Sequence, residues 1–150
     1  KEHLEKNSYD EVWCVFDLDI KKDDKKCVPD FNDAIRNATN LGYHVAYSND
    51  AFELWFYLHY QYIDCENHRT FYYEQLSNLW GINYEKDGKK YDFCRENYTR
   101  LQEDPKASQA KAIKNAEKLY TDRADLAYHK QNPVTQVSKL VKILNANLRK

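Results

Sequence analysis

The stretch VWCVFDLD, residues 12–19, decides the fold, because here an apolar run ends in two aspartates one residue apart. Its length and its content of valine and aromatic residues are typical of a buried parallel strand. Ligands of open α/β sheets bind just outside the carboxyl ends of such strands. Side chains two residues apart on a strand point the same way, so Asp17 and Asp19 are expected to converge on one point. Their repulsion and their hard oxygens favour Mg²⁺ or Mn²⁺ between them. The alternative is a strand followed by an acidic, solvated turn.

A helix and a second strand are expected to follow, completing a right-handed βαβ unit. Pro29 and Asp30 open the helix and Gly42 ends it. Its apolar face is formed by Phe31, Ala34, Ile35, Ala38 and Leu41. The second strand is predicted over 43–47. Because parallel neighbours end at the same edge, Ser48 and Asn49 should lie beside Asp17 and Asp19, where they could orient a ligand or a phosphate, or only end the strand.

The segment 51–62 (AFELWFYLHYQY) is predicted to be a helix that is apolar nearly all round, and therefore buried under the sheet or in a subunit contact. Glu53 lies in its first turn, close to the edge that carries Asp17 and Asp19. It is the third acidic candidate for a metal site. The spacing Asp50-x-x-Glu53 also fits a capping box, in which both residues only stabilise the helix start.

The remainder is predicted to be helical, with no clear pattern over 63–97. Helices are expected over 74–80 and 106–129, and Thr135 is expected to cap a final helix. We therefore expect a single domain over 1–150, of α/β class, with a parallel sheet core at about 9–65 flanked by helices. A helical C-terminal extension covers about 98–150.

Charge is unevenly distributed along the 150 residues. The chain carries a net charge of −1, yet residues 106–150 hold ten Lys and Arg against three Asp and Glu. A basic helical part beside an acidic part could hold a cation and a polyanion together. Lys111, Lys114 and Lys118 are the candidates for nucleic-acid binding. The alternative is a lysine-rich, solvated helix face.

Composition limits the class of protein further. The chain contains no methionine, so we expect an N-terminally truncated fragment. Four cysteines without paired spacing favour a reduced, cytoplasmic protein. No signal-like or membrane-spanning segment is present, so no membrane partner is expected. Three glycines are too few for a glycine-rich phosphate loop.

Two families have a strand that ends in Asp-x-Asp. The dehalogenase-like phosphatases use the first aspartate, here Asp17, as a nucleophile, and Ser48-Asn49 matches the end of their second strand. Their pattern continues with Gly-Thr, whereas Ile20-Lys21 follows here. Their late acidic pair would have to be Asp122 and Asp125, on a lysine-rich helical stretch.

The second resemblance covers most of the chain. Residues 12–19, the Ser-Asn-x-x-Phe-Glu-Leu-Trp string at 48–55, Leu58-His59 and Asn132-Pro133 before a helix with Leu140-Val141 resemble the RloB-like family of Toprim-domain proteins from prokaryotic defence loci. Asp50-Ala51 stands where the family usually has Pro-Cys. The resemblance implies a Toprim-like fold and Mg²⁺-dependent cleavage of nucleic-acid phosphodiesters. It also implies an essential glutamate at the end of an earlier strand, and residues 1–11 contain no such strand.

The expected function is therefore a metal-dependent nuclease of anti-phage defence. Asp17 and Asp19 would hold one or two Mg²⁺ (or Mn²⁺), with Glu53 as a ligand or general base. DNA or RNA would be the substrate, and a second copy or a defence protein a possible partner. Two alternatives stay open: a phosphatase with Asp17 as nucleophile, and a non-catalytic subunit that binds DNA or a partner.

Overall fold

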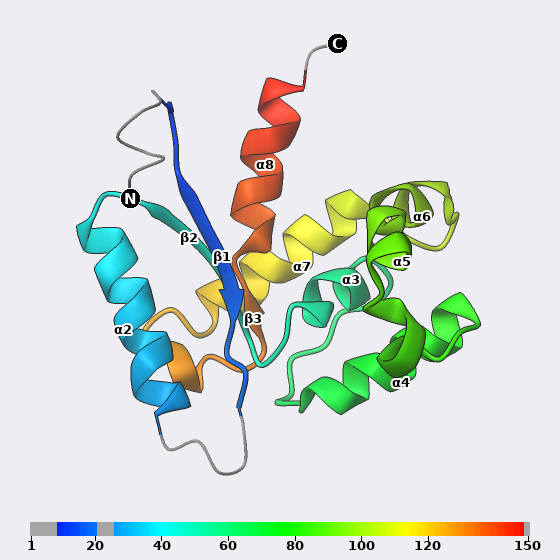
Figure 1. Cartoon of the computed structure of the whole chain (residues 1–150), viewed down its shortest axis with the longest axis horizontal. Coiled ribbons are helices and arrows are strands. Elements are labelled where there is room, and N and C mark those ends of the chain that lie inside the picture. Colours follow the sequence, from blue (N-terminus) through cyan, green and yellow to red (C-terminus); the bar gives the residue numbers. More distant parts are fainter. Residues whose placement is uncertain (1–8, 21–25, 149–150) are drawn as a thin grey trace.

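A small mixed sheet organises the molecule (Figure 1). The computed structural model describes residues 9–20 and 26–148. Strands β1 (Trp13–Asp17), β2 (His44–Asn49) and β3 (Val134–Thr135) lie in the order β1-β2-β3. β1 and β2 are parallel with Asp17 opposite Ser48, whereas β3 runs antiparallel to β2. The α/β class is confirmed. The expectation of a wholly parallel sheet is wrong at β3, which is too short for its periodicity to be seen in the sequence.

Helix α2 (Cys27–Asn40) covers one face of the sheet. Phe31 packs edge-on against Phe16 of β1 and Tyr47 of β2, with ring centroids 5.8 Å apart in each pair. The helix begins two residues before Pro29, and Gly42 follows it with a φ of +78°. Of the expected apolar face, Phe31, Ile35 and Ala38 are buried, while Ala34 and Leu41 are exposed.

Helix α3 (Glu53–Leu58) is buried as expected but shorter than the predicted 51–62. Leu54, Trp55, Tyr57 and Leu58 all belong to the core. The helix stops because residues of the later helix α7 (Gln109–Thr121) and its cap bind the carbonyl groups that a longer helix would use. Asn115 donates to the Leu58 carbonyl, the Ser108 N–H to that of His59, and the Lys111 ammonium to that of Tyr60. Long-range contacts therefore fix the helix length.

The other elements are mostly helical. Helix α4 begins five residues before the predicted 74–80 and ends, as expected, before Gly81 in the left-handed conformation. The predicted helix 106–129 is shorter at both ends, as α7, and the last helix begins two residues after Thr135, which lies in β3. These elements are α4 (Arg69–Trp80), the π-helix η1 (Tyr84–Gly88), α5 (Tyr91–Arg95), α6 (Asn97–Glu103), the 3₁₀ turn η2 (Tyr128–Lys130) and α8 (Val137–Asn147).

One apolar core joins the sheet to α2, α3, α4, α7 and α8. All four cysteines are free thiols. Over residues 9–20 and 26–148, no helix combines the length and the apolar character needed to cross a membrane.

Candidate functional site

Three aspartates lie at the carboxyl edge of the parallel strand pair. Asp17 ends β1, Asp19 lies two residues further on, and Asp50 directly follows β2. The Phe52 N–H, at the start of α3, donates to Asp17 Oδ2 over 3.3 Å. The strand register therefore brings the two strand ends and the first turn of α3 to one point, as the sequence predicts for Asp17 and Asp19.

The cationic group at this point is the guanidinium of Arg69, the first residue of α4. Its Nη1 lies 2.9 Å from Asp19 Oδ1, and its Nη2 lies 3.4 Å from Asp50 Oδ1 and 3.9 Å from Asp17 Oδ2. Nη2 also donates to the carbonyl groups of Leu18 and Asp50. The Arg69 N–H donates to Asp50 Oδ2 over 2.9 Å. Three carboxylates from two strand ends thus converge on one positive charge, which is the electrostatic arrangement of a cation site.

Burial of Arg69 opposes its charge, but Asp50, Asp17 and Asp19 outweigh burial and raise the pKa of the guanidinium. Its Nε is buried without a hydrogen-bond partner in the part of the chain that the structure describes. The guanidinium is therefore held by charge and carbonyl contacts of Nη1 and Nη2, while its Nε–H is left unused.

Glu53 lies beside this group, in the wall of a cavity. It is buried, and the Tyr84 hydroxyl donates to its Oε1 over 3.2 Å. Burial raises the pKa of Glu53; its own backbone N–H, Lys89 and Tyr84 oppose the rise, and Asp17 adds to it. Gly88 allows this arrangement, because a Cβ there would collide with the Tyr84 ring. A buried carboxyl with a raised pKa is the kind of group that can act as a general acid or base.

The donor set suits a hard divalent cation in its chemistry but not in its present arrangement. Carboxylate oxygens are the ligands that Mg²⁺ and Mn²⁺ prefer. Across residues 9–20 and 26–148, however, no three Asp, Glu, His or Cys side chains are grouped closely enough to share a metal ion. Arg69 separates the carboxylates of Asp17, Asp19 and Asp50, so a metal ion would have to take the place of its guanidinium.

Ser48 and Asn49 use their polar groups inside the fold. The Ser48 and Thr135 hydroxyls share a hydrogen bond of 2.8 Å, and the Asn49 amide donates to the Tyr128 carbonyl over 3.0 Å. Both side chains are fully buried. They tie β2 to β3 and to η2, on the side of β2 away from β1.

Two residues of the acidic edge are not identified by the sequence pattern. The spacing predicts Asp50 as the cap of α3, but the residue at that cap is Phe52, and Asp50 binds α4 instead. The signal that could have found Asp50 is its position directly after β2. Arg69 lies in the segment 63–97, where no pattern indicates which side chain reaches the sheet.

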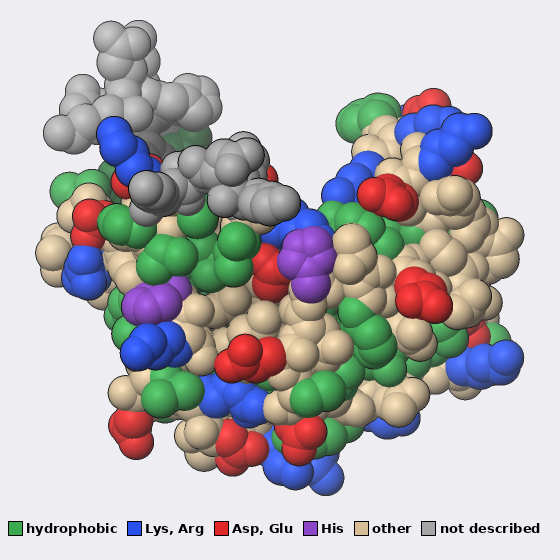
Figure 2. Space-filling view, turned by 90° about the horizontal axis from the view of Figure 1, so that it is seen from below, with side chains coloured by type: hydrophobic (Ala, Val, Ile, Leu, Met, Phe, Trp, Pro, Cys, Tyr) green, Lys and Arg blue, Asp and Glu red, His purple; other side chains and the backbone are tan. Residues whose placement is uncertain are grey.

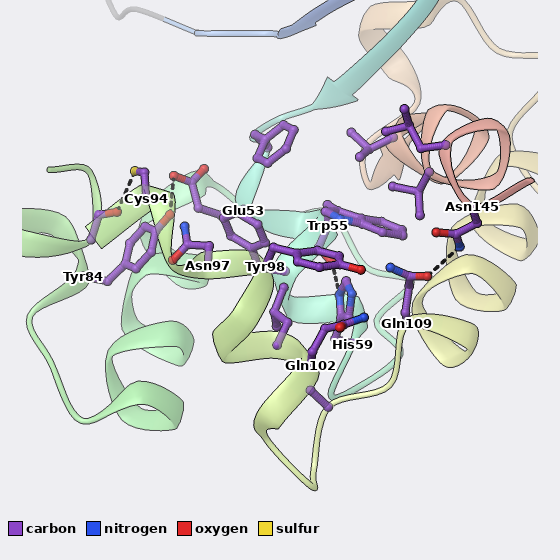
Figure 3. A pocket seen from close by; sticks show the side chains of 18 of the residues that line it. Glu53, Trp55, His59, Tyr84, Cys94, Asn97, Tyr98, Gln102, Gln109 and Asn145 are labelled. Atoms are coloured by element: carbon purple, nitrogen blue, oxygen red, sulfur yellow. Dashed lines mark hydrogen bonds between the residues drawn. The ribbon is translucent and has the colours of Figure 1, made fainter. Parts of the chain in front are cut away.

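A cavity of about 950 Å³ opens beside Glu53 (Figure 3). Phe52 and Glu53 line it, so the first turn of α3 forms a wall shared by the acidic edge and the cavity. Figure 3 shows Glu53, Tyr84 and Asn97 on one side, Gln109 and Asn145 on the other, and Trp55, Tyr98 and His59 between them. The apolar side chains of α8, Val137, Val141, Leu144 and Leu148, complete the lining.

The three candidate lysines lie on the exposed surface of α7. The Lys111 ammonium binds the Tyr60 carbonyl, and that of Lys118 lies 4.5 Å from the centre of the Tyr62 ring. Figure 2 shows the molecule from below the view of Figure 1, and on this face acidic, basic and apolar side chains are mixed rather than forming one continuous positive area. A polyanion that binds on the face shown in Figure 2 would therefore contact small groups of basic side chains and not a continuous positive area.

Comparison with known proteins gives one match. The model of the family described as RloB-like protein matches residues 1–144. The search of curated proteins found no match. The search of solved structures found none either.

Proposed function

Because the chain belongs to the RloB-like family, we propose that it is a metal-dependent nuclease that cleaves nucleic-acid phosphodiesters in prokaryotic anti-phage defence. The observation that carries the proposal is the convergence of Asp17, Asp19 and Asp50 on one cation position, beside the buried carboxyl of Glu53. This position lies at the carboxyl edge of parallel strands, where open α/β sheets bind their ligands.

Asp17 and Asp19 would hold Mg²⁺ or Mn²⁺, with Asp50 as a further oxygen donor. When bound, the ion would supply Lewis-acid polarisation of the scissile phosphate. Arg69 competes with it for the same carboxylates, and its planar fork of donors also matches phosphate oxygens. A guanidinium displaced from the aspartates would therefore be placed to bind a substrate phosphate. Glu53, with its raised pKa, is suited to take a proton from an attacking water.

The test compares Asp19→Asn with Asp33→Asn. Asp19 is half exposed, so its amide variant should fold, and Asp33 is an exposed aspartate of α2 that pairs with Arg36. Calorimetric titration with Mn²⁺ should show binding to the wild type and to Asp33→Asn, and at least about tenfold weaker binding to Asp19→Asn. Labelled single- and double-stranded DNA and RNA should be cut only in the presence of the metal. Absence of metal-dependent cleavage of all four substrates would contradict the proposal.

One observation favours a second candidate, a non-catalytic subunit that binds nucleic acid or a partner protein. Arg69 already forms ion pairs with the three aspartates, as it would in a purely structural ion-pair network. Binding of nucleic acid without turnover would support this candidate. A covalent phosphate trapped on Asp17 would instead support the phosphatase.

A further inference from the structure

We infer that the cavity between α3, α6, α7 and α8 binds a nucleobase, and that this base belongs to a single-stranded nucleic acid whose phosphate lies at the acidic edge. The inference rests on the proposed function, since it specifies the strand type that such a nuclease would accept. A base inside a duplex could not enter the cavity without leaving its stack, whereas a base of a single strand is free to do so.

The lining combines flat apolar rings with side-chain amides. Trp55, Phe52, Phe56, Tyr84 and Tyr98 provide aromatic surface from three segments of the chain. Bases stack on such rings whatever their sequence. A lining of aliphatic side chains alone would fit an alkyl chain better, and here the aliphatic part is confined to α8 and to Leu101 and Ala107.

The amides supply paired donors and acceptors, as base edges require. They are Asn97, Gln102, Gln109, Asn145 and Asn147. Gln109 Oε1 accepts a hydrogen bond from Asn145 over 2.7 Å, which holds the two amides side by side at one end of the cavity (Figure 3). Within the described part of the chain, neither the Gln102 amide nor the Tyr98 hydroxyl bonds to another residue. Both groups are therefore available to a ligand.

His59 extends the polar lining, and burial lowers the pKa of its ring. Its Nδ1 donates to the Trp55 carbonyl over 2.9 Å, which leaves Nε2 as an acceptor. The ring lies edge-on to Trp55, with centroids 4.8 Å apart. Because burial disfavours the charged form of this ring, a histidine placed here among amides and aromatic rings suits a neutral heterocycle better than an anionic ligand.

The charged groups of the cavity lie at the end next to the acidic edge. Glu53 and Lys89 line this end, and they interact electrostatically with each other. Arg69 acts on Lys89, and Asp17 acts on Glu53, so the cavity and the edge are within electrostatic reach. A nucleotide fits this polarity, with its base among the rings and amides and its phosphate toward Arg69 and Lys89.

Binding of labelled single-stranded oligonucleotides of about ten residues, measured by fluorescence anisotropy in EDTA, tests the inference without cleavage. Tyr98→Ala and Gln102→Leu should each weaken binding at least fivefold, about the effect of removing one stacked base or a paired amide interaction. Tyr98→Phe keeps the ring and should stay within about twofold of the wild type. Tyr91→Ala and Gln61→Leu, which change exposed residues outside the cavity, are the controls and should have no effect.

Two further measurements identify the part of the nucleic acid that is bound. An oligonucleotide with one abasic residue should bind the wild type more weakly than the intact oligonucleotide does, but should bind Tyr98→Ala equally well. The matching duplex should bind the wild type more weakly than the single strand. Nucleoside monophosphates that displace the oligonucleotide in a Tyr98-dependent way would support the base site and assign a free nucleotide as its source. Equal affinity of Tyr98→Ala, Gln102→Leu and both controls would overturn the inference.

The same variants separate this inference from the proposed function. Tyr98-dependent binding without any cleavage in Mn²⁺ would refute the nuclease and leave the base site standing. Cleavage in Mn²⁺ that Tyr98→Ala and Gln102→Leu leave unchanged, together with unchanged binding, would refute the base site alone.

Discussion

Replacing Arg69 by methionine would measure how far the fold depends on a cation at the acidic edge. Methionine keeps much of the apolar stem and removes the charge. The side chain of Asp50 is 2% exposed, whereas that of Asp19 is 50% exposed. Removing one partner of a buried ion pair costs about 3–5 kcal/mol, and an exposed pair contributes about 0–1 kcal/mol.

The expected loss lies at the lower end of this range. Asp50 keeps the hydrogen bond from the N–H of residue 69, so its charge is not left without a partner. We expect a loss of about 3 kcal/mol in the free energy of unfolding. For a domain of this size, Tm should fall by about 6–12 °C. Urea unfolding and thermal unfolding at pH 7 would measure both quantities.

Arg36→Met is the matched control, because Arg36 pairs with Asp33 on the surface of α2, where both side chains are more than half exposed. It should change stability by less than about 0.5 kcal/mol. Adding Mn²⁺ should raise the Tm of Arg69→Met more than that of the wild type, since the aspartates no longer have their own cation. A loss below about 1 kcal/mol, with no effect of Mn²⁺, would refute the reasoning that these carboxylates require a positive charge between them.

Three further changes test other parts of the structure. Trp55→Ala should cost about 3 kcal/mol in urea unfolding, at the lower end of the usual range because one side of the ring faces the cavity, and a loss below about 1 kcal/mol would contradict its place in the core. Glu53→Gln should gain stability relative to the wild type as pH rises above about 4.5. Because the pKa of this carboxyl is raised in the folded state, the folded state binds more protons than the unfolded chain, and the stability of the wild type falls as pH rises through this window. Parallel pH profiles of stability for the two proteins would contradict this. Reversing the charges of Lys111, Lys114 and Lys118 should weaken DNA binding and flatten its salt dependence by roughly one unit of log–log slope for each phosphate that is no longer bound, and an unchanged slope would mean that α7 is only a solvated face.

Local sequence patterns predict the features that depend on short stretches of chain. The apolar run before Asp17 and the βαβ order are enough to place β1 and β2 in parallel, and strand periodicity then places Asp17 and Asp19 at one edge. The burial of α3 follows from its apolar character on every side. In each case the information lies in the pattern of single segments and in their order along the chain.

The features that the sequence does not predict depend on contacts between distant residues. The Asp50-x-x-Glu53 spacing fits a cap, yet the partner of Asp50 is Arg69, nineteen residues away. The end of α3 is fixed by hydrogen bonds from α7, more than fifty residues later. A local sequence pattern does not indicate which distant donor will bind a carbonyl or a carboxylate. The partner of Asp50 and the end of α3 are therefore known only from the three-dimensional structure.

The charges at the acidic edge favour binding of a divalent cation, or of two further positively charged groups. Among residues 9–20 and 26–148, a connected set of side chains interacts here, four of them acidic and two basic: Asp17, Asp19, Asp50, Glu53, Arg69 and Lys89. With every group ionised, this set has an excess of two negative charges. The raised pKa of Glu53 relieves part of that excess by favouring its neutral form. A divalent cation in place of the Arg69 guanidinium would offset two of the negative charges of this set. The electrostatics of the edge therefore favour the same ligand class as the chemistry of the strand-end aspartates.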